Sequence, residues 1–556
     1  AQVLSSFPIT FDPDWQEVRV FEATAKRKDG TKLRAESYTT SYLSDPQYQL
    51  YYRNRQLVLS FSGLKKGDVV SIEYLITDKS EVNSYGNYFG DFEAFQANYP
   101  ILNKIYTLKI PENFNISYNG VGIDVEPIVV KTSGYTVFRW NKRDIFHLKN
   151  EVFSPGFSEI SPYLHISTFN SWEELGKWYS AFIKDQWELS DVAKKLVHQL
   201  IEGKTTTYEK VEEIHKWVVS NTRYVGLEFG VHGYKPYKAS QIFERRFGDC
   251  KDKALLLCSM LKEAKVEANM VLLRTRNLGR IEKKPASLAS FNHAITYIPE
   301  LDIFIDSTAE FSGLKELPYL DQGVDALIVS SDGKVEIKTI PQNSPDENIF
   351  FAKYQIETKK GQTEVTTIGS YIIKGVEAAM IRADFQNIEK QRETLVKQLS
   401  RNYPATKVEE ATFSDMKDIN SKVEISFKGK MNGILKMAGG STVSGTVWMG
   451  NTSLSSTYCP LTERKFPLEI PYSMKQVYDV TYRFQKGATV SLPEEKTIET
   501  KFGTFKRSVK KDSDSANIVS EVILKVTRVE VGDYREFKSF LNEIDKMTSE
   551  RILIKW

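Results

Sequence analysis

The sequence predicts a multidomain protein with an all-β N-terminal sandwich, a central α+β core and a β-rich C-terminal module with a few helices. Two observations lead to this class. The chain has 556 residues, which is too long for one ordinary domain. Short segments with strand patterns fill its first and last parts, whereas helical spacing is concentrated in the middle. We expect the modules to span residues 1–160, 161–335 and 336–556.

Composition excludes several function classes. The 75 basic and 72 acidic residues nearly cancel, which gives no electrostatic case for a nucleic-acid partner. No apolar run approaches the ~20 residues needed to span a bilayer. The chain begins Ala-Gln-Val without an initiator methionine, which would fit removal of a signal peptide. We therefore expect a periplasmic, cell-envelope or secreted protein, and the sequence does not indicate its oligomeric state.

Cysteine and histidine usage argues against disulfides, metals and cofactors. Only three cysteines are present, Cys250, Cys258 and Cys459, and they cannot form a disulfide framework. No C-x-x-C pair occurs and the six histidines are scattered, so we predict no zinc site. No calcium-binding loop is found either. We expect no metal and no cofactor.

Residues 1 to about 150 alternate between strand patterns and turn residues. Apolar and polar side chains alternate along 16–26, and turns at Gly30, Gly63 and Gly67 separate such segments. Turns at intervals of about 8–12 residues, without a convincing helix, are typical of an antiparallel sandwich. No acids, histidines or glycines cluster there as they would in a reaction site. We interpret the region as a binding or scaffold module.

Three amphipathic helices are predicted where the composition changes, near Pro155–Pro162. Capping-box spacing occurs at Ser171–Glu174 and Thr206–Glu209, and a further helix is expected from Ser190. Their aromatic residues are expected to lie in the core. The glycine- and aromatic-rich loop that follows, Tyr224–Lys238, does not match a phosphate-binding loop. We expect it to form one wall of a substrate groove.

The stretch Arg246–Leu257 carries the first sign of chemistry. Gly-Asp-Cys is followed at once by an apolar run that predicts a buried helix, which places Cys250 at or near the helix start. Unpaired backbone N–H groups and the helix dipole stabilise a thiolate there, and the thiolate is the nucleophilic form of cysteine. The other interpretation is a small buried residue. Cys258 lies about two helical turns further on and is expected to be a core residue.

Two strand patterns downstream carry a histidine and an acid. His293 lies in the segment 291–298 and Asp306 ends the segment 302–306, with a short turn between them. On adjacent antiparallel strands the two side chains could lie side by side. The acid would then orient the imidazole, and the imidazole would activate the thiol. Taken singly, His293 could be structural and Asp306 could merely end a strand in a turn.

The C-terminal part is expected to be β-rich, with two helices. Strands are predicted within 423–428, 442–449, 477–484, 489–491 and 519–529, helices at about 384–401 and 534–544, and a closing strand at 551–556. The basic run Lys506–Lys511 is interpreted as a solvated turn.

Gly-Asp-Cys at a helix start, then Asn-His on a strand, then Asp-Ser-Thr after the next strand resembles the transglutaminase-like superfamily of papain-like cysteine enzymes. The resemblance covers about residues 165–330. Residues 248–253 also resemble a bacterial subgroup with an all-β domain of unknown function before this core and a β-rich module after it. The resemblance to the superfamily implies that Cys250 is the nucleophile, His293 the general base and acid, and Asp306 the orienting acid. The backbone N–H of Cys250 and, as a further guess, Tyr224 are candidate oxyanion donors.

These residues predict a cysteine enzyme that forms an acyl-enzyme on peptide or protein substrates. Hydrolysis, as in a peptidase or amidase, is favoured slightly because water is the default acceptor. A protein-crosslinking transglutaminase would use the same residues with an amine as acceptor. An adhesion or scaffold protein with a catalytically silent core is the alternative from another class.

Overall fold

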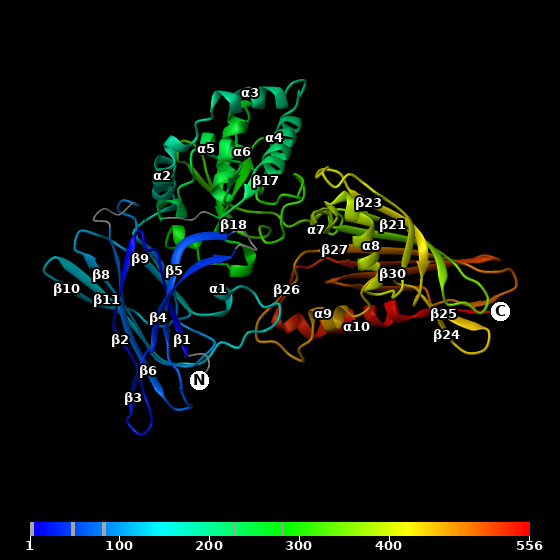
Figure 1. Ribbon diagram of the computed structural model, residues 1–556, viewed down its shortest axis with the longest axis horizontal. Coiled ribbons are helices and arrows are strands. Elements are labelled where there is room, and N and C mark those ends of the chain that lie inside the picture. The colour runs from blue at the N-terminus through cyan, green and yellow to red at the C-terminus, as the bar shows by residue number, and fades with distance from the viewer. Residues whose placement is uncertain (1–4, 46–49, 80–84, 227–229, 281) are drawn as a thin grey trace.

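The computed structural model describes residues 5–45, 50–79, 85–226, 230–280 and 282–556. Figure 1 shows the strands of the N-terminal module at lower left, the helices of the core above them and the C-terminal sheet at the right. This arrangement confirms the predicted multidomain class, with an all-β first part, an α+β centre and a β-rich last part. None of the helices in the described part of the chain has the length and apolar character that crossing a bilayer requires.

The N-terminal strands form four three-stranded antiparallel sheets, with the orders β1-β5-β4, β3-β2-β6, β10-β11-β8 and β7-β12-β9. The alternation of inward and outward side chains along each strand explains which residues form the cores of these sheets. In β2 the inward side chains are Val18 and Val20 and then, after a register shift, Ala23 and Ala25. The strands are β1 Ser6–Phe11, β2 Gln16–Lys26, β3 Lys32–Arg34, β4 Ser37–Asp45, β5 Leu50–Ser60, β6 Val69–Asp78, β7 Gly90–Ala94, β8 Ile101–Pro111, β9 Ser117–Val121, β10 Ile128–Thr132 and β11 Tyr135–Ile145.

Strand β12 (Tyr163–Ser167) ties the N-terminal module to the core. It lies beyond the predicted boundary at residue 160, yet it is the central strand between β7 and β9, and all five of its residues are buried. The chain then enters α2 (Trp172–Phe182) of the core without a long linker. The exact domain boundaries stay a prediction.

The core packs helices on a five-stranded antiparallel sheet of order β17-β16-β15-β18-β19. The predicted N-caps Ser171, Ser190 and Thr206 each accept a hydrogen bond from a backbone N–H in the first turn of their helices. The core elements are α1 Phe157–Ile160, α3 Asp191–Leu200, α4 Thr207–Asn221, β13 Arg223–Tyr224, η4 Gly230–Gly233, α5 Ala239–Arg245, β14 Phe247–Gly248, α6 Cys250–Glu263, β15 Asn269–Leu273, η5 Arg276–Leu278, η6 Leu288–Ser290, β16 His293–Ile298, β17 Ile303–Ile305, β18 Asp325–Val329 and β19 Val335–Thr339.

Helix α6 is the centre of the core, as its apolar composition predicts. Every residue from Cys250 to Leu261 is buried. Leu256 and Leu261 pack against α3, α4 and α5, whereas Leu255 and Cys258 pack toward the sheet. A helix buried on all sides is held rigidly, and so is the residue at its start.

The C-terminal module is built on an eight-stranded sheet of order β22-β23-β21-β20-β27-β31-β30-β29, in which only β20 and β27 pair in parallel among the described strands. A four-stranded sheet, β24-β25-β33-β28, includes the predicted closing strand. The elements are β20 Ile349–Glu357, β21 Val365–Ile373, α7 Val376–Phe385, α8 Gln391–Ser400, β22 Lys407–Phe413, β23 Val423–Met431, β24 Leu435–Met437, β25 Thr442–Thr446, α9 Leu454–Tyr458, β26 Leu468–Glu469, β27 Met474–Arg483, β28 Thr489–Ser491, β29 Lys496–Thr500, β30 Gly503–Lys511, β31 Ser515–Leu524, β32 Arg528–Val529, α10 Tyr534–Ser549 and β33 Arg551–Lys555.

Two local predictions in this module are wrong. The basic run Lys506–Lys511 is part of strand β30 rather than a turn. The buried guanidinium of Arg507 explains this, because it donates to Ser520 Oγ on the neighbouring strand and to Glu550. The helix expected over 384–401 is instead interrupted after α7. Asn387 accepts a hydrogen bond from the Glu389 N–H and starts a new helical segment.

Candidate active site

The start of helix α6 explains most of the sequence Gly-Asp-Cys-Lys-Asp. Asp249 is the N-cap and accepts from the Asp252 N–H, while the Asp252 carboxylate accepts from the Asp249 N–H in return. Cys250 is therefore the first residue inside the helix, as predicted. A side chain at position 248 would strike Asp252, since a Cβ there would lie 2.5 Å from the Asp252 Cβ. Glycine is required by this close approach.

The buried charged side chains next to Cys250 form ion pairs with the two acids of the Gly-Asp-Cys-Lys-Asp sequence. The Lys251 ammonium donates to Asp249, and the Arg245 guanidinium donates to Asp252 over 2.6 Å. Burial alone would lower the pKa of Lys251, but Asp249 and Cys250 outweigh it and raise the pKa. Lys251 therefore stays a cation beside the thiol. Burial lowers the pKa of Lys253 to about 8, and its amine donates to the Thr222 carbonyl.

The structure brings His293 and Asp306 into direct contact. His293 is the first residue of β16, and Asp306 follows the last residue of β17, which pairs antiparallel with β16. Nε2 of His293 lies 3.2 Å from Oδ2 of Asp306. The other carboxylate oxygen accepts from the backbone N–H and the hydroxyl of Thr308 over 2.8 and 2.7 Å. Asp306 is thus held on both oxygens.

The electrostatics of this pair favour an imidazolium and a carboxylate. Burial opposes both charges. For Asp306 the charge of His293 and the hydrogen bonds outweigh burial and lower the pKa to about 2. For His293 the charge of Asp306 and hydrogen bonds with Asp306 and Cys250 outweigh burial and raise the pKa well above its usual value. The imidazole of His293 therefore interacts with both the carboxylate of Asp306 and the thiol of Cys250.

Cys250 and His293 line one cleft of about 320 Å³. Its volume is within the usual range for sites that bind small molecules or peptide segments. The walls combine aromatic and apolar side chains from the loop before α5, from α2 and from the sheet. They include Tyr179, Tyr234, Leu272, Leu288 and Phe291. The thiol and the imidazole therefore face a space that a substrate could enter.

Tyr179 is a feature of the cleft that sequence reasoning missed. It lies on α2, is 1% exposed, and its hydroxyl has no hydrogen-bond partner among the residues that the structure describes. Burial raises its pKa, so the group is a neutral donor at physiological pH. A buried hydroxyl without a partner costs free energy. The Tyr179 hydroxyl can therefore donate a hydrogen bond to a group bound in the cleft, which Cys250 also lines.

A second buried acid, Asp321, lies next to the pair formed by His293 and Asp306. One oxygen or nitrogen each of His293, Asp306 and Asp321 lie within 4.8 Å of one another, and Asp321 is 2% exposed. Burial and the nearby charge of Asp306 raise the pKa of Asp321 to about 8, so this acid is protonated at neutral pH. Imidazole and carboxylate groups at such spacing could also hold a metal ion. Here, however, Nε2 of His293 is occupied by its bond with Asp306.

The N-terminal module supports the loop that leads to His293. Tyr88 is buried; its hydroxyl lies 3.1 Å from Ser287 Oγ and accepts from the N–H groups of Leu288 and Ala289. Leu288 in turn lines the cleft. The β module thus contributes directly to the shape of the site, a role that its sequence did not indicate.

The loop before α5 and the two residues Tyr224 and Cys258 lie around the cleft in different ways. Part of the loop Tyr224–Lys238 forms a wall of the cleft through Gly233 and Tyr234, as expected, while residues 227–229 lie outside the described residues. Tyr224 is half-buried beside the cluster that holds Cys250 and does not line the described cleft. Cys258 is a core residue, as expected, and its sulfur lies 3.6 Å from Thr296 Oγ1.

Comparisons with known families agree with this geometry. Residues 194–297, which contain Cys250 and His293, match the model described as the transglutaminase-like superfamily. The core is transglutaminase-like. Residues 1–147 and 447–554 match two domains of unknown function for which structures are solved, DUF3857 and DUF3858. The predicted resemblance, with one β domain before the transglutaminase-like core and one module after it, is confirmed.

One solved structure shares the fold of nearly the whole chain. The chain matches a protein from Parabacteroides distasonis described as "a putative protease", with a TM-score of 0.69 and 15% identity, over 99% of this chain and 92% of that one. At this identity the likeness shows a common fold. A protein from Cytophaga hutchinsonii described as "a putative cysteine protease" matches 40% of this chain and 78% of its own, with 16% identity and a TM-score of 0.18. No curated protein matches the chain.

Proposed function

We propose that this protein is a cysteine hydrolase that cleaves peptide or amide bonds through an acyl-enzyme on Cys250. One observation carries the proposal: Cys250, at the start of a buried helix, shares an open cleft with His293, whose Nε2 is bonded to Asp306. A nucleophile, a base and an orienting acid in this order are the requirements of a catalytic triad. The transglutaminase-like core supports the same assignment.

In the first half of the reaction, the Cys250 thiolate attacks the carbonyl carbon of the substrate. The charge that develops on the carbonyl oxygen would be stabilised by the backbone N–H of Cys250 and by the hydroxyl of Tyr179. His293 then gives its proton to the departing nitrogen, the C–N bond breaks and an amine or ammonia leaves. A thioester to Cys250 remains.

In the second half, His293 removes a proton from water, and the resulting hydroxide attacks the thioester. The carbon–sulfur bond breaks, the carboxylic acid product leaves and the sulfur departs as the thiolate paired with the imidazolium. Asp306 keeps the imidazole oriented throughout and stabilises its charged form. Each turnover consumes one amide and one water, and it releases one acid and one amine.

Thiol reactivity tests the nucleophile. A thiolate held by an imidazolium should react with iodoacetamide at pH 6 much faster than a free cysteine, which is mostly protonated there. Mass mapping of the modified protein should place the label on Cys250. Cys258 and Cys459 are internal controls, because both are buried and burial raises the pKa of each thiol. Slow labelling of Cys250, together with unchanged peptide turnover in a Cys250→Ala variant, would refute the proposal.

The acyl acceptor is tested with glutamine-containing peptides and with unactivated peptides, each with and without a primary amine. Hydrolysis releases amine or ammonia and a free acid, whereas transamidation incorporates the added amine into the product. We expect the free acid as the main product. We keep the expected periplasmic, cell-envelope or secreted location as a part of the proposal, and fractionation of the native cells tests it.

A further inference from the structure

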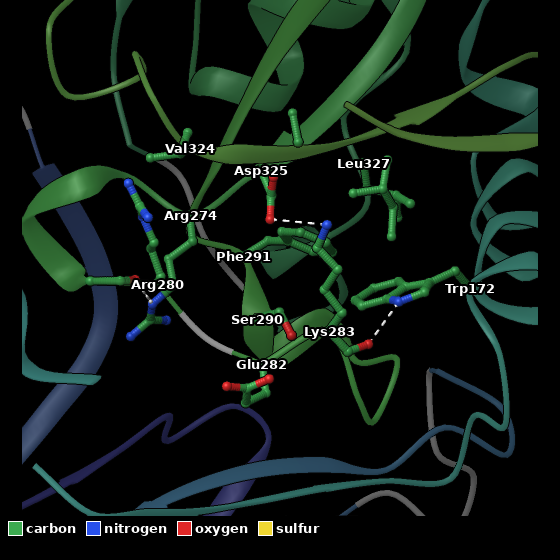
Figure 2. A pocket seen from close by; sticks show the side chains of 13 residues that line it. Trp172, Arg274, Arg280, Glu282, Lys283, Ser290, Phe291, Val324, Asp325 and Leu327 are labelled. Atoms are coloured by element: carbon green, nitrogen blue, oxygen red, sulfur yellow. Dashed lines mark hydrogen bonds and ion pairs between the residues drawn. The ribbon is translucent and has the colours of Figure 1, made fainter. Parts of the chain in front are cut away.

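A second pocket lies beside the cleft that holds Cys250 and His293. Its cavity volume is about 60 Å³, and its lining includes Trp172 from the start of α2, Phe291 from the segment before β16, and Leu327 and Ile337 from the sheet. Figure 2 shows this pocket, with Leu327 and Trp172 on one side and the loop that carries Glu282 and Lys283 across it. No chemistry described so far uses it.

The two spaces share one floor. Ala294 on β16 is paired with Leu272 on β15, Leu272 with Leu327 on β18, and Leu327 with Ile337 on β19. Directly paired residues in antiparallel strands point to the same face of the sheet. The first two of these side chains line the cleft and the last two line the second pocket. The row therefore runs from the cleft into the pocket.

Phe291 forms the partition between the two spaces, because it lines both. Its ring lies 5.7 Å from that of Trp172, centroid to centroid, with the planes tilted by 51°. Phe291 is separated from His293 by a single residue, so the partition is fixed to the segment that carries the imidazole. A substrate bound at Cys250 would pass this aromatic pair on its way along the floor.

The charged residues of the lining are the cations Arg274, Arg280 and Lys283 and the acids Glu282 and Asp325. Lys283 pairs with Asp325 over 3.3 Å, and both side chains are largely solvated, at 61% and 45% exposed. The indole N–H of Trp172 donates to the Lys283 carbonyl over 2.8 Å and holds the loop in place. Exposed ion pairs of this kind contribute little free energy. Selection therefore depends on the aromatic and aliphatic interior, which suits an apolar side chain.

We propose that this pocket is a specificity subsite that binds a large aliphatic or aromatic side chain of the peptide substrate. The proposal rests on the proposed function of the adjacent cleft. Strands lie about 4.8 Å apart, so the floor at β18 is roughly 10 Å from β16. An extended peptide advances about 3.3 Å per residue. The recognised side chain therefore belongs to a residue about three positions from the scissile bond.

The test scans phenylalanine, against glycine, through the three positions on each side of a fixed scissile bond. We expect one outer position at which phenylalanine raises kcat/KM by roughly 10- to 100-fold in the wild-type protein. Ile337→Phe, which fills the pocket, should abolish this gain, so that kcat/KM for the phenylalanine peptide falls to about the value for the glycine peptide. Ile337→Ala should shift the preference toward tryptophan. Ile368→Phe is the matched control, since Ile368 is 45% exposed on β21 of the C-terminal sheet.

The outcomes separate the subsite from the reaction. Cleavage without any preference between phenylalanine and glycine, or an equal loss on every peptide in Ile337→Phe, overturns the subsite and leaves the proposed hydrolase intact. If the wild-type protein cleaves no peptide, the Cys250→Ala variant is titrated with the same peptides by calorimetry. Tighter binding of a phenylalanine peptide that Ile337→Phe removes then supports the subsite, and equal binding overturns it. Thermal melts check that each variant is folded.

Discussion

Nε2 of His293 lies 3.2 Å from Oδ2 of Asp306, just past the end of the strand that pairs with the histidine's own strand. The contact leaves the other ring nitrogen for Cys250, and it raises the pKa of the imidazole while lowering that of the acid to about 2. In the proposed reaction this pair is the group that takes the proton of the thiol and returns it to the leaving nitrogen.

Asp306→Asn should reduce the reactivity of Cys250. The amide keeps the shape of the side chain but removes the negative charge that stabilises the imidazolium. We expect alkylation by iodoacetamide at pH 6 to slow at least about tenfold, and peptide turnover to fall further. Asp302→Asn, on the turn between β16 and β17, is the control, because its carboxylate pairs with Lys338 away from the site. Equal rates in the wild-type protein and Asp306→Asn would contradict the assigned role.

Tyr179→Phe tests the second oxyanion donor. No described residue bonds to this hydroxyl, so its removal should leave thermal stability unchanged or slightly raise it. We expect kcat to fall by about 10- to 100-fold with little change in KM, because the bond would form mainly in the transition state. Tyr208→Phe on α4 serves as the control. An unaltered kcat would remove Tyr179 from the mechanism.

Asp321→Asn should stabilise the protein at neutral pH. The folded state holds this acid protonated up to about pH 8, whereas the unfolded chain ionises it near pH 4, so the wild-type protein loses stability as pH rises through that window. Asparagine does not titrate. The melting temperature of the variant should therefore match the wild-type value near pH 4 and exceed it at pH 7.5. A lower value at pH 7.5 would show that the carboxyl group itself is required.

Tyr88→Phe should weaken the contact by which the N-terminal module holds the loop before His293. The change removes the acceptor of two backbone N–H groups and the partner of Ser287. We expect a loss of about 1–3 kcal/mol of stability and faster proteolysis within 279–290. Tyr99→Phe, at a residue that is 60% exposed, should have neither effect. Cleavage of the loop at an unchanged rate would mean that the N-terminal module does not hold it.

His165 should make the protein sensitive to acid. Burial, and secondarily Arg274, lower its pKa to about 4, so the folded protein keeps it neutral while the unfolded chain protonates it near pH 6.5. Stability should fall as pH drops from 6.5 to 4, by up to roughly 3 kcal/mol from this residue. Denaturant titrations of His165→Phe across that range should show a shallower decline. An identical slope would contradict the assignment.

Local patterns in the sequence were sufficient for the nucleophile helix and its partners. A cap residue, a cysteine and an apolar run determine where α6 begins, and a short turn between two strands brings His293 near Asp306. These relations depend on residues close together in the chain. The family resemblance added the order in which the helix and the strands combine.

Tyr179, Asp321 and Tyr88 were missed for a common physical reason. Each reaches the site through packing between distant segments: α2 lies across the cleft, Asp321 follows a loop after β17, and Tyr88 comes from another module. Helical spacing places Tyr179 on an inward face but does not say what that face meets. The basic run in β30 was misinterpreted similarly, because Glu550, one of the partners of Arg507, lies at the C-terminal end of α10, 43 residues further along the chain.

The parallel pair β20 and β27 sets an order for the synthesis of this protein. Strand β21 can pair with β20, and β23 with β21, as soon as they leave the ribosome, but the opposite edge of β20 stays open until β27 is made. An open strand edge recruits other chains. A nascent chain that stalls between Met431 and Met474 carries that edge exposed, and this interval is where the growing polypeptide most needs protection by a chaperone.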